Sequence, residues 1–175
     1  MVPVAVGIDV GGTKIAGGIV EPEGRILHSL TVATPSHFAE LELALCRLVE
    51  CLLVAAEEET GSAPLDIVGI GVAVPGEVDR RQGVAIGACN LPWKDFGMKR
   101  LLENRYGLPT QIENDADAAA VGVYRYAPEA RGIESFVLMT IGTGIGGGII
   151  LNGKLHGDGW PMAGEVGHMI VLPDG

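Results

Sequence analysis

Long hydrophobic runs are missing from this sequence: no stretch reaches the roughly 18 uninterrupted apolar residues that a membrane-spanning helix needs. The opening segment, Met1–Val10, lacks the basic region that begins a secretory signal. Basic residues are also scarce, with 12 Lys and Arg against 22 Asp and Glu and a net charge of −10. An acidic surface is poorly suited to bind nucleic acid or an anionic membrane. We therefore expect a cytoplasmic protein whose partners are small molecules.

Cysteine is scarce too, with only Cys46, Cys51 and Cys89 in the chain. Their number is odd, and the first two share a predicted helix at a spacing that points the side chains apart. We interpret all three as reduced packing residues. Apolar residues, in contrast, make up 47% of the 175 residues, which is enough to bury one good core. This predicts a single domain, or one domain with a fragment of another.

The first half of the chain predicts an α/β fold that opens with an antiparallel meander. Residues 4–10, 14–20 and 25–32 are short β-branched runs separated by turns. Residues 36–60 carry leucines at helical spacing, and residues 67–74 form an apolar run typical of a strand buried on both faces. A helix between the meander and a buried strand implies a parallel crossover. The predicted sheet is therefore mixed.

The second half predicts another glycine-turn hairpin after an α/β segment. We expect helices over residues 95–106 and 116–126, with a short strand at 110–112 between them. Residues 136–141 and 148–151 then form a hairpin-like pair that resembles the opening of the chain.

Two glycine-rich turns are candidates for phosphate binding, because glycine lets backbone N–H groups approach an anion closely. The first is Asp9-Val10-Gly11-Gly12-Thr13-Lys14 and the second runs from Gly142 to Gly148. A strand follows the first turn, so it is not the strand-loop-helix nucleotide loop. The alternatives remain a tight hairpin with a charged flank for the first turn and a flexible turn for the second.

Three further motifs carry polar side chains. Glu113-Asn114-Asp115-Ala116 stands where a short strand gives way to a helix, so its polar groups lie beside helix N–H groups, although Asp115 could simply cap the helix. Glu165 and His168 are three residues apart and would share a face in a turn or helix, where they could grip adjacent hydroxyls of a polyol. Asn90 lies in an irregular bend stiffened by proline.

Taken in this order, the motifs resemble those of the ROK sugar kinases, a family that includes glucokinases, fructokinases and N-acetylmannosamine kinases. The resemblance runs from Val4 to Val171. It implies an actin-like, ribonuclease-H-type ATPase fold with two lobes, of which residues 1–130 are the amino-terminal lobe. Residues 131–175 are then the start of a second, truncated lobe.

The resemblance also implies roles for individual residues in ATP-dependent phosphorylation of a hexose. Asp115 is the expected general base for the sugar hydroxyl. Asn90, Asn114, Asp115, Glu165 and His168 are expected to bind sugar hydroxyls. Phosphate binding is expected at two sets of residues, and Asp9 is expected to help hold the Mg²⁺ that the phosphates carry. These sets are Gly11, Gly12, Thr13 and Lys14 in the first turn, and Gly142, Thr143 and Gly144 in the second.

The sequence departs from the family pattern near its end. Family members continue after Glu165–His168 with a cysteine cluster that binds a structural Zn²⁺ together with the histidine, and that cluster is absent here. The resemblance therefore implies no zinc in this truncated chain and a less well oriented His168. We expect the chain alone to be a weak or inactive kinase, and a homodimer is possible.

A sugar-binding regulator of the same family, without kinase activity, is the alternative reading. Such regulators carry a DNA-binding domain before the first glycine turn, and Asp9 lies too near the start for one. The sequence leaves the identity of the hexose open.

Overall fold

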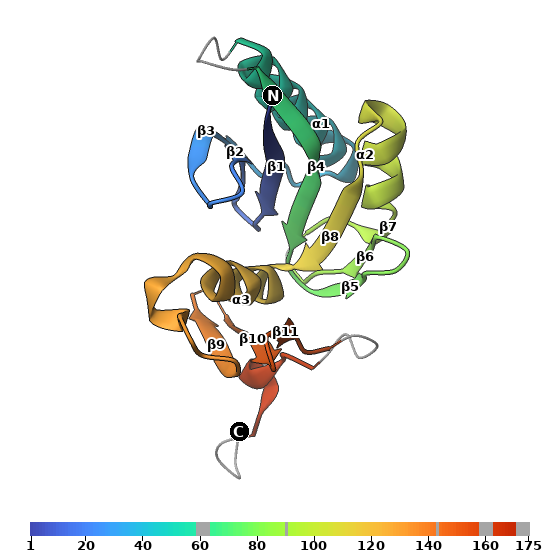
Figure 1. Cartoon of the computed structure of the whole chain (residues 1–175). Coiled ribbons are helices and arrows are strands. Elements are labelled where there is room, and N and C mark those ends of the chain that lie inside the picture. The colour runs from blue at the N-terminus through green and yellow to red at the C-terminus, as the bar shows by residue number, and fades with distance from the viewer. Residues whose placement is uncertain (59–63, 90, 143, 158–162, 171–175) are drawn as a thin grey trace. The chain divides into compact units, whose positions relative to one another are not determined.

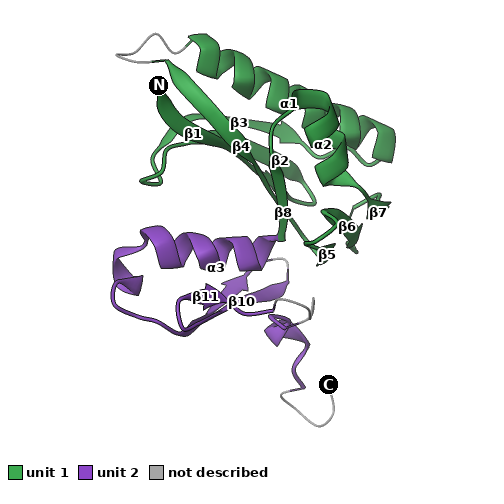
Figure 2. Cartoon of the chain, turned by 45° about the vertical axis from the view of Figure 1, so that its right-hand side comes forward, with its two compact units in different colours: residues 1–113 green, residues 114–175 purple. Residues whose placement is uncertain are grey.

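The computed structural model describes residues 1–58, 64–89, 91–142, 144–157 and 163–170. The chain forms two compact units, Met1–Glu113 and Asn114–Gly175, shown in different colours in Figure 2. Figure 1 labels the helices and strands of both. No helix in the described part of the chain is long and apolar enough to cross a membrane.

The first unit is built on a five-stranded mixed sheet with the order β3-β2-β1-β4-β8. Its first three strands form the predicted antiparallel meander, and β1 pairs in parallel with β4. Both the meander and the parallel crossover predicted from the sequence are confirmed. The strands are β1 (Val2–Val10), β2 (Lys14–Val20), β3 (Ile26–Ala33), β4 (Leu65–Val74) and β8 (Thr110–Asn114).

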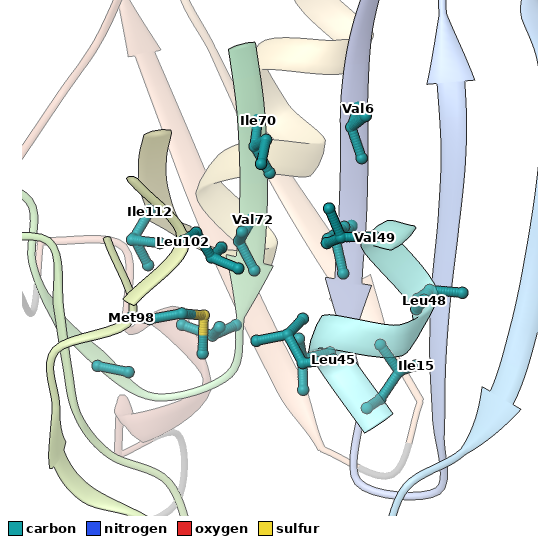
Figure 3. Close-up of a cluster of buried hydrophobic side chains, with 14 of the residues drawn as sticks. Val6, Ile15, Leu45, Leu48, Val49, Ile70, Val72, Met98, Leu102 and Ile112 are labelled. Atoms are coloured by element: carbon teal, nitrogen blue, oxygen red, sulfur yellow. The ribbon is translucent and has the colours of Figure 1, made fainter. Parts of the chain in front are cut away.

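Helix α1 (Phe38–Glu58) makes the crossover and packs its leucine stripe on the sheet. Leu41, Leu45, Leu48 and Leu52 are all buried. Gly17 in β2 makes room for this packing, because a Cβ there would lie 2.9 Å from Leu52 and 3.1 Å from Leu48. Figure 3 shows the same helix meeting strands β1 and β4 through Val49 and its neighbours. Each buried leucine contributes about 2 kcal/mol, so this stripe is a substantial part of the hydrophobic stabilisation of the unit.

Three short strands that the sequence did not reveal form a second, smaller sheet in the first unit. They are β5 (Glu77–Asp79), β6 (Val84–Gly87) and β7 (Lys94–Phe96), in that order. Because Lys94–Phe96 pairs with β6, helix α2 begins only at Met98, so the predicted helix start at residue 95 is wrong. Gly107 ends α2 in the left-handed conformation, and its N–H donates to the carbonyl of Glu103.

The second unit combines one long helix with a three-stranded antiparallel sheet, ordered β11-β10-β9. Strand β10 begins at Ile145, so Gly146–Gly148 belong to the strand and not to the turn, where the sequence had placed them. The elements are α3 (Asp115–Tyr126), β9 (Phe136–Ile141), β10 (Ile145–Leu151) and β11 (Lys154–Leu155), with short 3-10 turns at Pro128–Ala130 and Val166–His168.

Helix α3 belongs by its contacts to the second unit, so the division between the units falls between Glu113 and Asn114. The sequence suggested a lobe boundary after residue 130. The three cysteines are all free thiols, as expected, but only Cys46 is buried. Cys51 and Cys89 are exposed, so the prediction that they are packing residues is wrong.

Candidate functional site

The first glycine turn joins β1 to β2 and is held in place by Thr34, the residue that follows β3. The N–H of Gly11 donates to the carbonyl of Lys14 at 2.9 Å, which closes a tight hairpin. Thr34 braces this hairpin twice, since its hydroxyl donates to the carbonyl of Gly11 at 2.7 Å and its N–H donates to the carbonyl of Thr13 at 3.0 Å. Gly12, Thr13 and Lys14 are exposed. The turn is therefore rigid and open to solvent, as an anion-binding turn must be.

Asp9 and Lys14 give the first turn its local charges. Asp9 is the next-to-last residue of β1 and its side chain is exposed. Partial desolvation by the surrounding chain raises the pKa of Asp9, and the nearby charge of Lys14 lowers it by a smaller amount. A nearby cation stabilises the ionised form of a carboxylate that has lost part of its hydration. A cation beside Asp9 would offset this desolvation, and the expected role of Asp9 in holding Mg²⁺ stays a prediction.

The bend that follows β6 is described only in part, because Asn90 lies outside the described residues. Its neighbours Leu91 and Trp93 are buried in the core of the first unit. Trp93 packs beside Phe96, with ring centroids 6.3 Å apart. The apolar part of the predicted Asn90-Leu91-Pro92-Trp93 motif is thus a structural anchor.

Asn114 and Asp115 form the start of helix α3. The Asn114 side-chain oxygen accepts from the N–H groups of Ala116 at 2.9 Å and Asp117 at 3.1 Å, so Asn114, and not Asp115, is the N-cap. Asp115 is exposed, and its Oδ1 also accepts from the Ala116 N–H at 2.8 Å. The helix N-terminus stabilises the ionised form of a carboxylate at this position. Asp115 therefore presents an exposed carboxylate at the first residue of α3, and its role as a general base stays a prediction.

The glycines of β10 are packing residues. A Cβ on Gly146 would lie 3.2 Å from the Cβ of Ala116, and one on Gly148 would lie 2.5 Å from the Cβ of Ala120. On the strand residue between them, a Cβ on Gly147 would lie 2.6 Å from the carbonyl oxygen of Gly164. The strand is thus close-packed against α3 through alternate glycines and against the Gly164 segment through Gly147.

Gly164 and Gly167 lie against carbonyl groups of the same strand. A side chain on Gly164 would collide with the carbonyl oxygen of Gly147, and one on Gly167 would collide with that of Ile145. The two carbonyls are two residues apart in an extended strand and so point the same way. The spacing of three between the glycines is what allows this turn to touch both carbonyls. The sequence analysis missed this contact, although the Gly-x-x-Gly spacing was a visible signal.

This turn brings Glu165 and His168 together, as their spacing predicts. The Nε2 atom of His168 lies 3.7 Å from a carboxylate oxygen of Glu165, and the backbone N–H of His168 donates to the carbonyl of Glu165 at 3.1 Å. The Glu165 side chain is partly covered, whereas that of His168 is 78% exposed. The pair presents an acceptor and an imidazole on one side of a fixed turn.

The last parts of the candidate site are the second glycine turn and the expected metal sites. The N–H of Gly142 donates to the carbonyl of Gly144 at 2.9 Å, and Thr143 lies outside the described residues. Within the described ranges, no three His, Cys, Asp or Glu side chains gather to hold a metal ion.

Comparison with known proteins gives the same family by profile, by sequence and by structure. The ROK family profile matches residues 5–175. A glucokinase of Streptomyces coelicolor is 38% identical over 97% of this chain and 50% of its own length. A putative xylose repressor of Caldicellulosiruptor is 36% identical over 71% of this chain and 32% of its own length. The chain spans about half the length of the curated glucokinases it matches.

Among solved structures, a ROK family glucokinase from Streptomyces griseus, in complex with glucose and AMPPNP, matches with a TM-score of 0.84. That match covers 98% of this chain and 52% of the glucokinase, at 38% identity. The mixed sheet with its opening meander therefore belongs to the actin-like ATPase fold of these kinases.

Proposed function

This chain belongs to the ROK family, and we propose that it is the amino-terminal half of an ATP-dependent hexose kinase of the glucokinase kind. The observation that carries the proposal is the exposed carboxylate of Asp115 on the first residue of α3, in a chain whose fold matches a glucokinase solved with glucose and AMPPNP. A regulator that only binds sugar has no need of a base at that position.

In the proposed reaction, Asp115 takes the proton of one sugar hydroxyl as that oxygen attacks the terminal phosphorus of ATP. The bond between this phosphorus and the bridging oxygen breaks, and ADP leaves with the electron pair. The hydrogen bond from the Ala116 N–H to Asp115 fixes the direction of the carboxylate, so the base is oriented before the sugar binds.

The sugar is held, in this proposal, by three side chains of the second unit. The cap uses the side-chain oxygen of Asn114, so its NH₂ group is the part that donates to a sugar oxygen. Glu165 accepts from a hydroxyl, and His168, 3.7 Å from it, contacts the neighbouring oxygen. Adjacent hydroxyls of a hexose lie about 3 Å apart, which suits an acceptor and an imidazole on one turn.

The phosphates of ATP are assigned to the two glycine turns. Gly11–Thr13, braced by Thr34, offer backbone N–H groups, and Lys14 adds a positive charge. Gly142–Gly144 are the second proposed contact. Bound Mg²⁺ supplies charge neutralisation on the phosphates. Asp9 is the residue that would hold it, directly or through a water molecule.

The test is a coupled assay of glucose-dependent ADP formation by the full-length parent protein. Asp115→Asn keeps the helix start intact but removes the base, so we expect kcat to fall by about 10² to 10⁴. The matched control is Asp66→Asn, an exposed carboxylate on β4, which should leave kcat unchanged. Full activity in Asp115→Asn would overturn the assigned base, and a wild-type protein inert toward every hexose would overturn the kinase proposal.

A sugar-binding regulator is the second candidate, favoured by the match to a putative xylose repressor. Calorimetry on the parent protein distinguishes the two candidates. A regulator would bind sugar and would consume no ATP. A kinase would couple sugar binding to ADP release.

A further inference from the structure

One ion pair of the first unit joins two segments that are far apart in the sequence. The Nε atom of Arg80 lies 2.7 Å from Oε1 and 2.8 Å from Oε2 of Glu113. The side chains are only 22% and 25% exposed. Charge-assisted hydrogen bonds of this length are stronger than neutral ones, and partial burial reduces the screening that weakens surface pairs.

Arg80 is itself held in a fixed turn between β5 and β6. Asp79, the residue before it, accepts from the Gln82 N–H through its side chain at 2.9 Å and from the Gly83 N–H through its carbonyl at 2.8 Å. The carbonyl of Gly83 in turn accepts from the first turn of α2, at the N–H of Lys99. The guanidinium therefore extends from a rigid base, so it can fix the position of its partner.

The position of Glu113 matters for the start of helix α3. It precedes Asn114, the N-cap of α3, and lies two residues before Asp115. The division between the two compact units falls directly after it. Any rotation of the Glu113 backbone would redirect the peptide plane from which the cap and the proposed base begin.

We propose that Arg80 is a positioning residue: it clamps Glu113, the last residue of the first unit, and so fixes the backbone that leads into the helix cap at Asn114. Its consequence for catalysis rests on the proposed function. Because Arg80 contacts both carboxylate oxygens of Glu113, the Glu113 carboxylate is engaged in structure and is not a second base beside Asp115. In this proposal Arg80 does not contact the sugar and acts through Glu113 and Asn114.

The first test needs no enzyme activity. Hydrogen exchange is measured on the full-length parent protein and on its Arg80→Gln variant, with Arg81→Gln as the matched control, since Arg81 is the exposed neighbour in the same turn. We expect the amides of Ala116 and Asp117, which donate to the cap, to exchange at least 10-fold faster in Arg80→Gln only. Unchanged exchange at these amides would overturn the proposal.

The second test is kinetic and separates positioning from general damage. In Arg80→Gln and Glu113→Gln we expect the kcat for sugar phosphorylation to fall by about 10- to 100-fold. The KM for ATP should stay unchanged, because the turn at Gly11–Thr13 is braced independently by Thr34. The exchanged pair, Arg80→Glu with Glu113→Arg, should recover part of the loss. A wild-type protein without kinase activity would count against the proposed function, while hydrogen exchange would still decide the role of Arg80.

Discussion

Gly164 and Gly167 seat a polar turn directly on the edge of β10. Neither glycine has a positive φ, so conformational freedom does not explain them. Each is instead placed where a Cβ would meet a strand carbonyl, at Gly147 or Ile145. The turn between them carries Glu165, and His168 follows directly. Small residues at two positions thus fix the distance of Glu165 and His168, the proposed sugar-binding side chains, from the strand.

Replacing Gly167 with alanine should therefore affect sugar binding first. Its Cβ would collide with the Ile145 carbonyl, so the turn must lift away and carry Glu165 and His168 with it. In the parent protein we expect the KM for hexose to rise by about 10- to 100-fold while the KM for ATP stays constant. Gly122→Ala is the control, because a Cβ there meets nothing within 4 Å and alanine favours the helix. A KM for hexose that stays at its wild-type value in Gly167→Ala would refute this steric reading.

The sequence could single out most of the candidate site residues, because they sit in short local motifs, and their roles stay predictions. Asp9, Asn114, Asp115, Glu165 and His168 each lie at the end of a strand or the start of a turn, where local spacing identifies them. Arg80 escaped prediction because its partner lies 33 residues away. Gly146–Gly148 were misassigned to a turn because glycine carries no hydrophobic pattern, and only the neighbouring α3 shows why they are there.

Helices α1 and α2 are joined by a polar clasp at the end of α2. The Tyr106 hydroxyl donates to the carbonyl of Cys46 at 2.8 Å, and Arg105 donates to Glu50 at 2.7 Å. Desolvation, together with the nearby Cys46, raises the pKa of Tyr106 well above its usual range, so the hydroxyl remains a donor at all ordinary pH values. The clasp fixes α2, whose first turn holds Gly83 near Arg80.

We expect Tyr106→Phe to lower the free energy of unfolding by about 1 kcal/mol, the usual net contribution of one hydrogen bond. Cys46 lies within α1, so its carbonyl keeps a helical partner and the loss should not exceed this amount. Urea denaturation followed by circular dichroism measures the change. Tyr126→Phe, at an exposed position on α3, is the control and should be neutral. Equal stabilities for wild type and Tyr106→Phe would mean that the clasp contributes nothing.

At the element scale, the long periodic segments and the short strand at 110–112 were predictable, whereas the strands of the smaller sheet were not. The leucine stripe placed α1 within two residues of its observed bounds, Phe38–Glu58. Strands β5, β6 and β7 are three or four residues long and are defined by pairing with one another, which no local pattern encodes. Asp95, read as the start of a helix, instead takes a positive φ of 51° inside β7.

At the scale of the whole molecule, one face of the second unit's sheet is only partly covered among the described residues, because the turn that contains Val166 lies over Gly147 but leaves strand β9 exposed. Alternate residues of β9 are large, apolar and exposed, with Ile141 reaching 81%. Ile145, paired with Ile141 across the hairpin, continues the patch on β10. The patch consists of Val137, Met139, Ile141 and Ile145. The other face is filled by α3 through Gly146 and Gly148.

An apolar sheet face of this kind normally packs against another layer of the same domain. The chain spans about half the length of the glucokinases it matches, so we expect the remaining half of the parent protein to supply that layer. The 175-residue chain by itself should then expose the patch and associate with copies of itself. It should also show little kinase activity in the coupled assay, far below the usual 1 to 10³ s⁻¹.

The double substitution Met139→Lys with Ile141→Lys tests whether the remaining half of the parent protein covers the patch. It should be beneficial in the 175-residue chain and destabilising in the full-length parent. In the 175-residue chain it places charge on an exposed face, so analytical ultracentrifugation should show less self-association at an unchanged circular dichroism spectrum. In the full-length parent it would bury two charges, and the free energy of unfolding should drop by several kcal/mol. Val68→Lys, an exposed apolar position on β4, is the control in the short chain. If the double variant is as stable as the wild type in the parent protein, the patch faces solvent there as well, and the missing half must pack elsewhere.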